Sequence, residues 1–164
     1  MRKLLVPILL VLVVPATALG SPEVGAVDGT LSVREGRGMV QLSVRGSITG
    51  RLERGRITIT DANPYDNRRP TVYGAERTIY RGDKTTVYQG RSIRFRLLGS
   101  QWQLRVEGRG IFVSAIGRGR GLIQGAGDPQ AGIFYDGVWS LNDEGYHSLP
   151  DEPTTFQLVA TTGD

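Results

Sequence analysis

Three carboxylates near the C-terminal end of the chain, Asp136, Asp143 and Glu144, lie in a stretch rich in aromatic residues. Aromatic rings can stack on sugar rings, and a pair of carboxylates can act as acid and base in glycoside hydrolysis. The strings Asp136-Gly137 and Asn142-Asp143-Glu144-Gly145 are also typical of turns beside a strand. We favour turns, so an enzyme is the less favoured class, and a small carbohydrate-active hydrolase is kept as the alternative function.

A second group of polar residues, Asp61, Asn63 and Asp66, could offer oxygen ligands to calcium. The loop that contains them lacks the glycine and the terminal glutamate of a dedicated calcium loop, so an Asx-turn is the favoured interpretation. His147 is the only histidine and the chain has no cysteine, which excludes multi-histidine and thiolate metal sites. We therefore expect neither a metal nor a cofactor.

Arginine gives the strongest chemical signal in the chain. Residues 34–120 contain 18 basic and 7 acidic residues, a net charge of +11, whereas residues 121–164 contain 7 acidic residues and no basic ones. Clustered arginines create a positive potential and bind phosphates or carboxylates through paired hydrogen bonds. This charge layout indicates an anionic polymer of the cell envelope or an anionic lipid surface as partner. The alternatives are that the acidic part folds back and neutralises the basic part, or that the abundance of arginine and glycine reflects a GC-rich genome.

Seven arginines are the candidates for that contact. They lie at outward positions of predicted strands, in the loop after residue 61, and in a run of alternating glycine and arginine: Arg68, Arg69, Arg94, Arg96, Arg105, Arg118 and Arg120. Ala115, Gly117, Gly119 and Gly121 share one strand face that has almost no side chain. Such a face permits tight curvature or the close approach of another backbone.

The elements that must carry these residues are strands. Apolar and polar residues alternate with a period of two in 39–45, 56–60, 92–97 and 102–107, and no window after residue 20 keeps a helical period. The chain therefore predicts an all-β fold, an antiparallel sandwich or closed barrel of about 10–12 short strands.

The sequence also contains two similar segments. Leu31-Ser32-Val33-Arg34-Glu35-Gly36-Arg37-Gly38 is similar to Leu104-Arg105-Val106-Glu107-Gly108-Arg109-Gly110, with one residue deleted. This similarity predicts two pseudo-repeated halves, 28–99 and 101–162, that share one core within a single domain, 21–164. A chance match between short glycine- and arginine-rich strings is the alternative.

Residues 1–20 have the layout of a secretory signal peptide. Arg2 and Lys3 precede the apolar run Leu4 to Val14, and small residues follow up to a cleavage position after Gly20. The run is shorter than the roughly 20 residues of a membrane-spanning helix. We therefore expect a secreted or cell-envelope protein with no transmembrane segment after signal removal, and whether the segment is cleaved or retained stays open.

Three features of the sequence carry a resemblance: the Glu-Gly-Arg-Gly strings, the Asp66-Asn67-Arg68-Arg69-Pro70 loop and the stretch Phe134 to Asn142. In these the chain resembles a group of small secreted proteins of high-GC Gram-positive bacteria, a group with no established activity. The resemblance implies export and assigns no catalytic or binding residue. We expect an exported, non-catalytic β domain with a structural or binding role in the envelope or outside the cell, with no nucleic-acid partner and with its oligomeric state open.

Overall fold

The structure is a computed structural model that describes residues 27–127 and 135–160, and it contains strands and no helix in these ranges. One antiparallel sheet has the order β2-β3-β1-β4-β5, with β6 beside β3, and it is not closed into a barrel. The all-β prediction is therefore confirmed. The strands are β1 (Gly29–Asp61), β2 (Thr71–Arg81), β3 (Thr85–Gly125), β4 (Val138–Leu141), β5 (His147–Ser148) and β6 (Thr154–Leu158).

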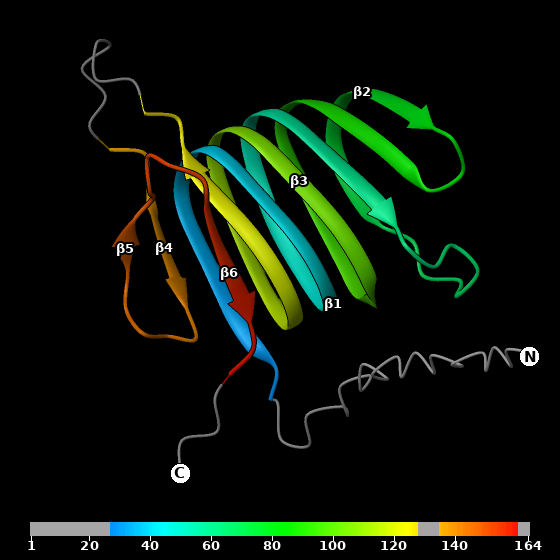
Figure 1. Cartoon of the computed structure of the whole chain (residues 1–164). Coiled ribbons are helices and arrows are strands. Elements are labelled where there is room, and N and C mark those ends of the chain that lie inside the picture. The colour runs from blue at the N-terminus through cyan, green and yellow to red at the C-terminus, as the bar shows by residue number, and fades with distance from the viewer. Residues whose placement is uncertain (1–26, 128–134, 161–164) are drawn as a thin grey trace, which may run out of the picture.

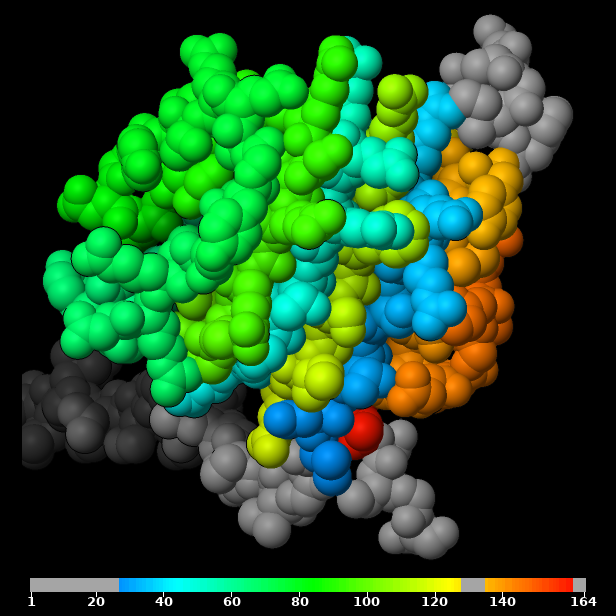
Figure 2. Space-filling view, turned by 180° about the vertical axis from the view of Figure 1, so that it is seen from behind, coloured from blue at the N-terminus to red at the C-terminus, as the bar shows by residue number. Residues whose placement is uncertain are grey.

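Strands β1 and β3 form an antiparallel ribbon that coils upon itself (Figure 1). Gly38 of β1 pairs with Gly108 on one side and with Gly125 on the other, so β3 returns to the same place after 17 residues. Arg54 pairs in the same way with Arg91 and Arg109, which are 18 residues apart. Figure 2 shows the resulting alternation on the surface, where blue-to-cyan stretches of β1 lie between green-to-yellow stretches of β3.

Glycines form the corners at which this ribbon bends. Gly38, Gly55 and Gly108 have φ values of 135°, 151° and 147°, which L side chains rarely adopt. A Cβ added to any of them would overlap a backbone oxygen of the opposing strand. The backbone ladder therefore continues through each corner. A second line of corners lies on the other side of the coil, where Gly46 pairs with Gly117, and we call the straight stretch between one corner and the next a limb. Gly90 and Gly125 complete the first line of corners, which we call the glycine corner.

The number of strands differs from the sequence-based expectation. In place of 10–12 short strands, the described residues contain two long strands of 33 and 41 residues and four shorter ones. The predicted strands 39–45 and 56–60 are limbs of β1, and 92–97 and 102–107 are limbs of β3. Alternation breaks at the glycine corners because the chain bends there, but the hydrogen-bonded pairing does not stop.

The core lies inside the coil. Alternate side chains of every limb point inward and are almost fully buried, among them Leu31, Leu42, Ile57, Trp102 and Leu104. β3 crosses the proposed boundary between segments 28–99 and 101–162 without interruption, and both segments contribute to this one core. The internal repeat itself stays a prediction.

One end of the coil is covered by the C-terminal strands. β4 pairs with β1, and β6 pairs with the last limb of β3. The ring centroids of Trp139 and Phe156 lie 5.5 Å apart, and the Phe156 ring occupies the space that a side chain at Gly121 would need. Backbone approaches the glycine face closely, as predicted, at Gly117 and Gly119, where the carbonyl oxygens of Arg45 and Ser43 in β1 lie close; at Gly121 the neighbour is the Phe156 side chain instead. At the other end of the sheet, β2 is the edge strand.

Candidate anion-binding surface

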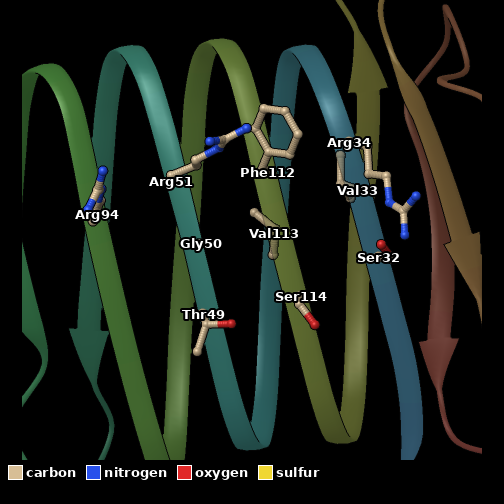
Figure 3. Close-up of a pocket in the computed structure, with 10 residues that line it drawn as sticks. All are labelled: Ser32, Val33, Arg34, Thr49, Gly50, Arg51, Arg94, Phe112, Val113 and Ser114. Atoms are coloured by element: carbon tan, nitrogen blue, oxygen red, sulfur yellow. The ribbon is translucent and has the colours of Figure 1, made fainter.

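The strand register gathers outward side chains into rows that run across the limbs. Arg51 pairs with Phe112 on one side and with Arg94 on the other, and Arg94 pairs with Tyr73 of β2. Arg34 lies beyond Phe112, because Val33 pairs with Val113 in the neighbouring limb. Figure 3 shows Arg34, Phe112, Arg51 and Arg94 side by side on consecutive limbs. We call Arg34, Phe112, Arg51, Arg94 and Tyr73 the arginine row.

Two guanidinium groups of this row lie over the faces of aromatic rings. The Arg51 guanidinium carbon lies 3.8 Å from the centroid of the Phe112 ring, and that of Arg34 lies 4.4 Å from the centroid of Tyr146. Cations are attracted to the ring face in this geometry. Stacking uses the flat face of a guanidinium and leaves its in-plane N–H groups available for an anion.

Hydroxyl groups line the adjacent row, two residues along each limb and therefore on the same face. Ser114 pairs with Ser32 and Thr49, and Arg96 pairs with Thr49 and Thr71. An open hollow of about 400 Å³ lies over the two rows. It combines guanidinium groups, hydroxyl groups and one aromatic ring, which is a suitable set of partners for an oxyanion carried on a chain.

Within the described ranges, no arginine of this face forms an ion pair with a carboxylate. The ion pairs found there join Arg56 and Arg105 to Glu107, and Arg118 to Asp28. None involves the arginine row, and none uses a carboxylate of residues 135–160, so in those ranges no ion pair supports neutralisation by the acidic part of the chain. Like charges directly opposite each other destabilise a sheet, and Arg51 faces Arg94 in this way.

On the opposite face of the coil, arginines are paired with a carboxylate. Glu107 accepts hydrogen bonds from Arg105 at 2.7 Å and from Arg56 at 2.6 Å. The hydrogen bond from Arg105 is the largest influence and lowers the pKa of Glu107; burial, next in size, raises this pKa, and the hydrogen bond from Arg56 lowers it further, so the net shift is downward. Arginine therefore serves the fold on that face through a shared carboxylate.

The structure does not bring the seven predicted arginines to one face. Arg94 and Arg96 lie on the surface described above, whereas Arg105 belongs to the Glu107 cluster. Arg118 pairs with Asp28 at 2.9 Å, and Arg120 lies opposite Gln157 of β6. Arg68 and Arg69 follow β1 in the connection to β2.

Sequence reasoning missed Arg34, Arg51 and Phe112. The signal that could have found them is the length of one turn: Arg34 and Arg51 are 17 positions apart, and Arg94 and Phe112 are 18 apart. These are the spacings at which the limbs of one strand return to the same height. Local alternation alone does not reveal this period.

In the loop that follows β1, the proposed calcium ligands act as hydrogen-bond acceptors within the protein. Asp61 Oδ1 accepts the N–H of Asn63, which is the favoured Asx-turn. Asp66 accepts the N–H of Arg68 and, at 2.6 Å, the Ser100 hydroxyl. The Ser100 hydrogen bond, as the largest contribution, lowers the pKa of Asp66. Both carboxylates thus shape the loop.

Strand β4 separates the carboxylates of the hydrolase alternative. Asp136 precedes β4 and is 8 % exposed, and its Oδ2 accepts the N–H of Gly127 at 2.7 Å. Asp143 and Glu144 lie in the exposed turn that follows β4. The four residues of β4 alone span about 13 Å, whereas the carboxylates of glycosidases are about 5–9.5 Å apart. The structure does not bring these groups together.

Comparisons with known proteins return no match: no protein-family model fits the chain, and no curated protein or solved structure is similar to it. Among the described residues, no helix is long and apolar enough to cross a membrane. The expected signal peptide, residues 1–20, lies outside the described ranges. The function must therefore be inferred from the geometry of the surface itself.

Proposed function

We propose that this protein is a non-catalytic β scaffold that binds an anionic polymer through the arginine row. The observation that carries the proposal is the direct pairing of Arg51 with Arg94, on an open face and without a carboxylate partner in the described part of the chain. Like charges at directly opposed positions disfavour a sheet. The Arg51 guanidinium leans over Phe112, so an oxyanion bound in the space between Arg51 and Arg94 would offset the positive charge of both and accept hydrogen bonds from both side chains.

Cation–π contacts support the same interpretation. Arg51 and Arg34 are held over aromatic rings, so less side-chain entropy is lost when an anion binds. Flanking hydroxyls of Ser114 and Thr49 add further hydrogen-bonding groups beside the cations. A rigid sheet that presents ordered cations and hydroxyls is suited to recognition of a repeating anionic chain.

The cellular setting is part of the proposal. The N-terminal pattern and the resemblance to small secreted proteins both favour an exported protein. The anionic polymer would then belong to the cell envelope or to the extracellular medium. A role as a structural surface component that is retained by such a polymer is compatible with the same contacts.

The test is a double substitution, Arg51→Gln with Arg94→Gln, compared with Arg77→Gln and Arg81→Gln on the edge strand β2. Both variants lose two positive charges, but only the first alters the arginine row. We expect the first variant to bind labelled dextran sulfate about tenfold more weakly at low salt, which is roughly 0.7 kcal/mol per arginine. The control should change binding by less than about threefold, because Arg77 and Arg81 lie outside the arginine row and would make no direct contact with a polymer bound there.

Binding is measured by fluorescence anisotropy at increasing salt, and circular dichroism verifies that each variant keeps its strands. Wild-type binding should weaken sharply as salt screens the contacts. An equal loss in the two double variants would mean that net charge alone drives association. Absence of wild-type binding at low salt would refute the proposal.

A further inference from the structure

A second line of arginines runs along the glycine corner. Arg109 pairs directly with Arg37 on one side and with Arg54 on the other, and Arg54 also pairs with Arg91. Four consecutive limbs thus each contribute one arginine, and we call these four residues the corner row. Arg54, Arg91 and Arg109 are exposed, and Arg37 is half-buried.

This arrangement carries a larger electrostatic cost than the arginine row. Three successive cross-strand pairs are like-charged, and each such pair disfavours the sheet. None of the four residues takes part in an ion pair within the described ranges. Glu53, next to Arg54 in sequence, packs over Gly110 and also forms no ion pair there. Glu107 pairs with Arg56 and Arg105, whereas Glu76, which lies at Gly90 beside Arg91, likewise forms no ion pair with this row in the described ranges.

Glycines make the corner row accessible. Arg37, Arg54 and Arg109 are each followed or preceded by a corner glycine, Gly38, Gly55 or Gly108, that has no side chain to cover the backbone. An open hollow of about 470 Å³ is lined by three of the arginines and two of these glycines, with Ala126 at its end. A ligand can therefore lie against the backbone and still reach the guanidinium groups.

The corner row is parallel to the arginine row. Arg37 follows Arg34 by three residues in one limb, and Arg54 follows Arg51 by three residues in another. Because neighbouring strands are about 4.8 Å apart, the four arginines of the corner row extend over about 14 Å along the coil axis.

We infer that the corner row is a second anion-binding line, which takes a linear chain of closely spaced phosphate or sulfate groups lying along the coil axis, across the strands. The inference rests on the proposed function for the class of ligand, but it concerns different residues. A single line of cations along one corner of the coil fits a chain, whereas a lipid bilayer attracts clusters of basic residues spread over a surface. A ligand must span about 14 Å to engage the whole row, which is longer than the three phosphates of tripolyphosphate reach.

A length series tests this inference: orthophosphate, tripolyphosphate and long-chain inorganic polyphosphate as probes. The corner variant is Arg54→Gln with Arg109→Gln, and its matched partners are the Arg51/Arg94 and Arg77/Arg81 double variants. We expect the wild-type protein to bind the long chain at least about tenfold more tightly than tripolyphosphate. The corner variant should lose most of that advantage, and the Arg77/Arg81 control should retain it.

A single charge reversal separates binding from folding. Arg54→Glu places a carboxylate between Arg91 and Arg109, so we expect a higher melting temperature at low salt together with weaker binding of long-chain polyphosphate by about tenfold or more. A purely structural role for the row would change the melting temperature and leave binding unaltered. This result would overturn the inference.

Failures of the two proposals can be told apart. If the Arg51/Arg94 variant loses binding while the corner variant binds the long chain like the wild type, the proposed function stands and the corner site is refuted. If only the corner variant loses binding, the corner site stands and the arginine row is refuted. Binding to phosphatidylglycerol vesicles without binding to long-chain polyphosphate would overturn the assignment of a chain-like ligand.

Discussion

Single arginines have three different environments on this scaffold. Arg56 and Arg105 share the carboxylate of Glu107, Arg51 stacks on Phe112, and Arg54 faces two other arginines. Only the first environment supplies an opposite charge within the protein. The residue type is the same in every case, so its function depends on which side chain the sheet places opposite it.

Glu107→Gln should reduce the pH dependence of stability. The pKa of Glu107 is lowered in the folded protein, mainly by the hydrogen bond from Arg105. Its contribution is therefore present above the unfolded-state pKa, near 4.5, and is lost as the pH falls through the folded-state value. Because both arginines are well exposed, the loss should not exceed about 1 kcal/mol.

Urea unfolding between pH 3 and pH 7 measures this effect. The wild type should be more stable than the variant near pH 7, and the difference should vanish at the acidic end. A difference that is constant across this range would show that the Glu107 carboxylate does not stabilise the fold through its charge.

At the scale of the strands, glycine decides where the ribbon bends. Alternation in 39–45, 56–60, 92–97 and 102–107 predicted the limbs correctly, because the period of two is a local property of a half-buried strand. The joining of these limbs into β1 and β3 could not be predicted. A glycine between two strands normally indicates a turn that ends the pairing, whereas here the ladder passes through it.

Gly55→Ala tests the corner geometry, with Gly82→Ala as the matched control. Both positions have positive φ, but an added Cβ at Gly55 would overlap the backbone oxygen of Glu107, and at Gly82 it meets nothing within 4 Å. We expect a loss of about 1 kcal/mol in the free energy of unfolding at Gly82 and of at least about 3 kcal/mol at Gly55.

Thermal and urea unfolding of the two glycine variants provide the comparison. Equal losses would mean that backbone conformation alone matters and that limbs at the corner are not closely packed. A larger loss at Gly55 would support the close approach of β1 and β3 along this line.

At the scale of the whole molecule, the coiling of β1 and β3 brings residues that are one turn apart in the sequence onto the same surface. One turn of 17 or 18 residues brings Arg34 beside the limb that carries Phe112 and aligns Arg51 with Arg94. The basic middle of the chain builds the coil, and the acidic C-terminal part supplies the strands β4, β5 and β6 at one end. The basic residues therefore lie mainly on the coil, and the acidic residues of the C-terminal part lie mainly at its covered end.

Export of the whole chain is a separate prediction. The extracellular protein should begin at Ser21, and replacement of Leu10 by arginine should keep the full-length precursor inside the cell, because it interrupts the apolar run. N-terminal sequencing and immunoblotting of cell and medium fractions measure both outcomes. Wild-type protein found only in the cytosol with Met1 intact would contradict export.

Alternation of apolar and polar residues determined the all-β fold, because inward and outward positions are set by neighbouring residues in the chain. Composition determined the basic character and excluded thiolate chemistry. Only the tertiary structure decided which arginines meet, since Arg51 and Arg94 are paired by a register that depends on contacts between distant limbs. For the same reason Arg94 and Arg96 lie on the face of the arginine row, whereas Arg105, Arg118 and Arg120 lie on other parts of the surface.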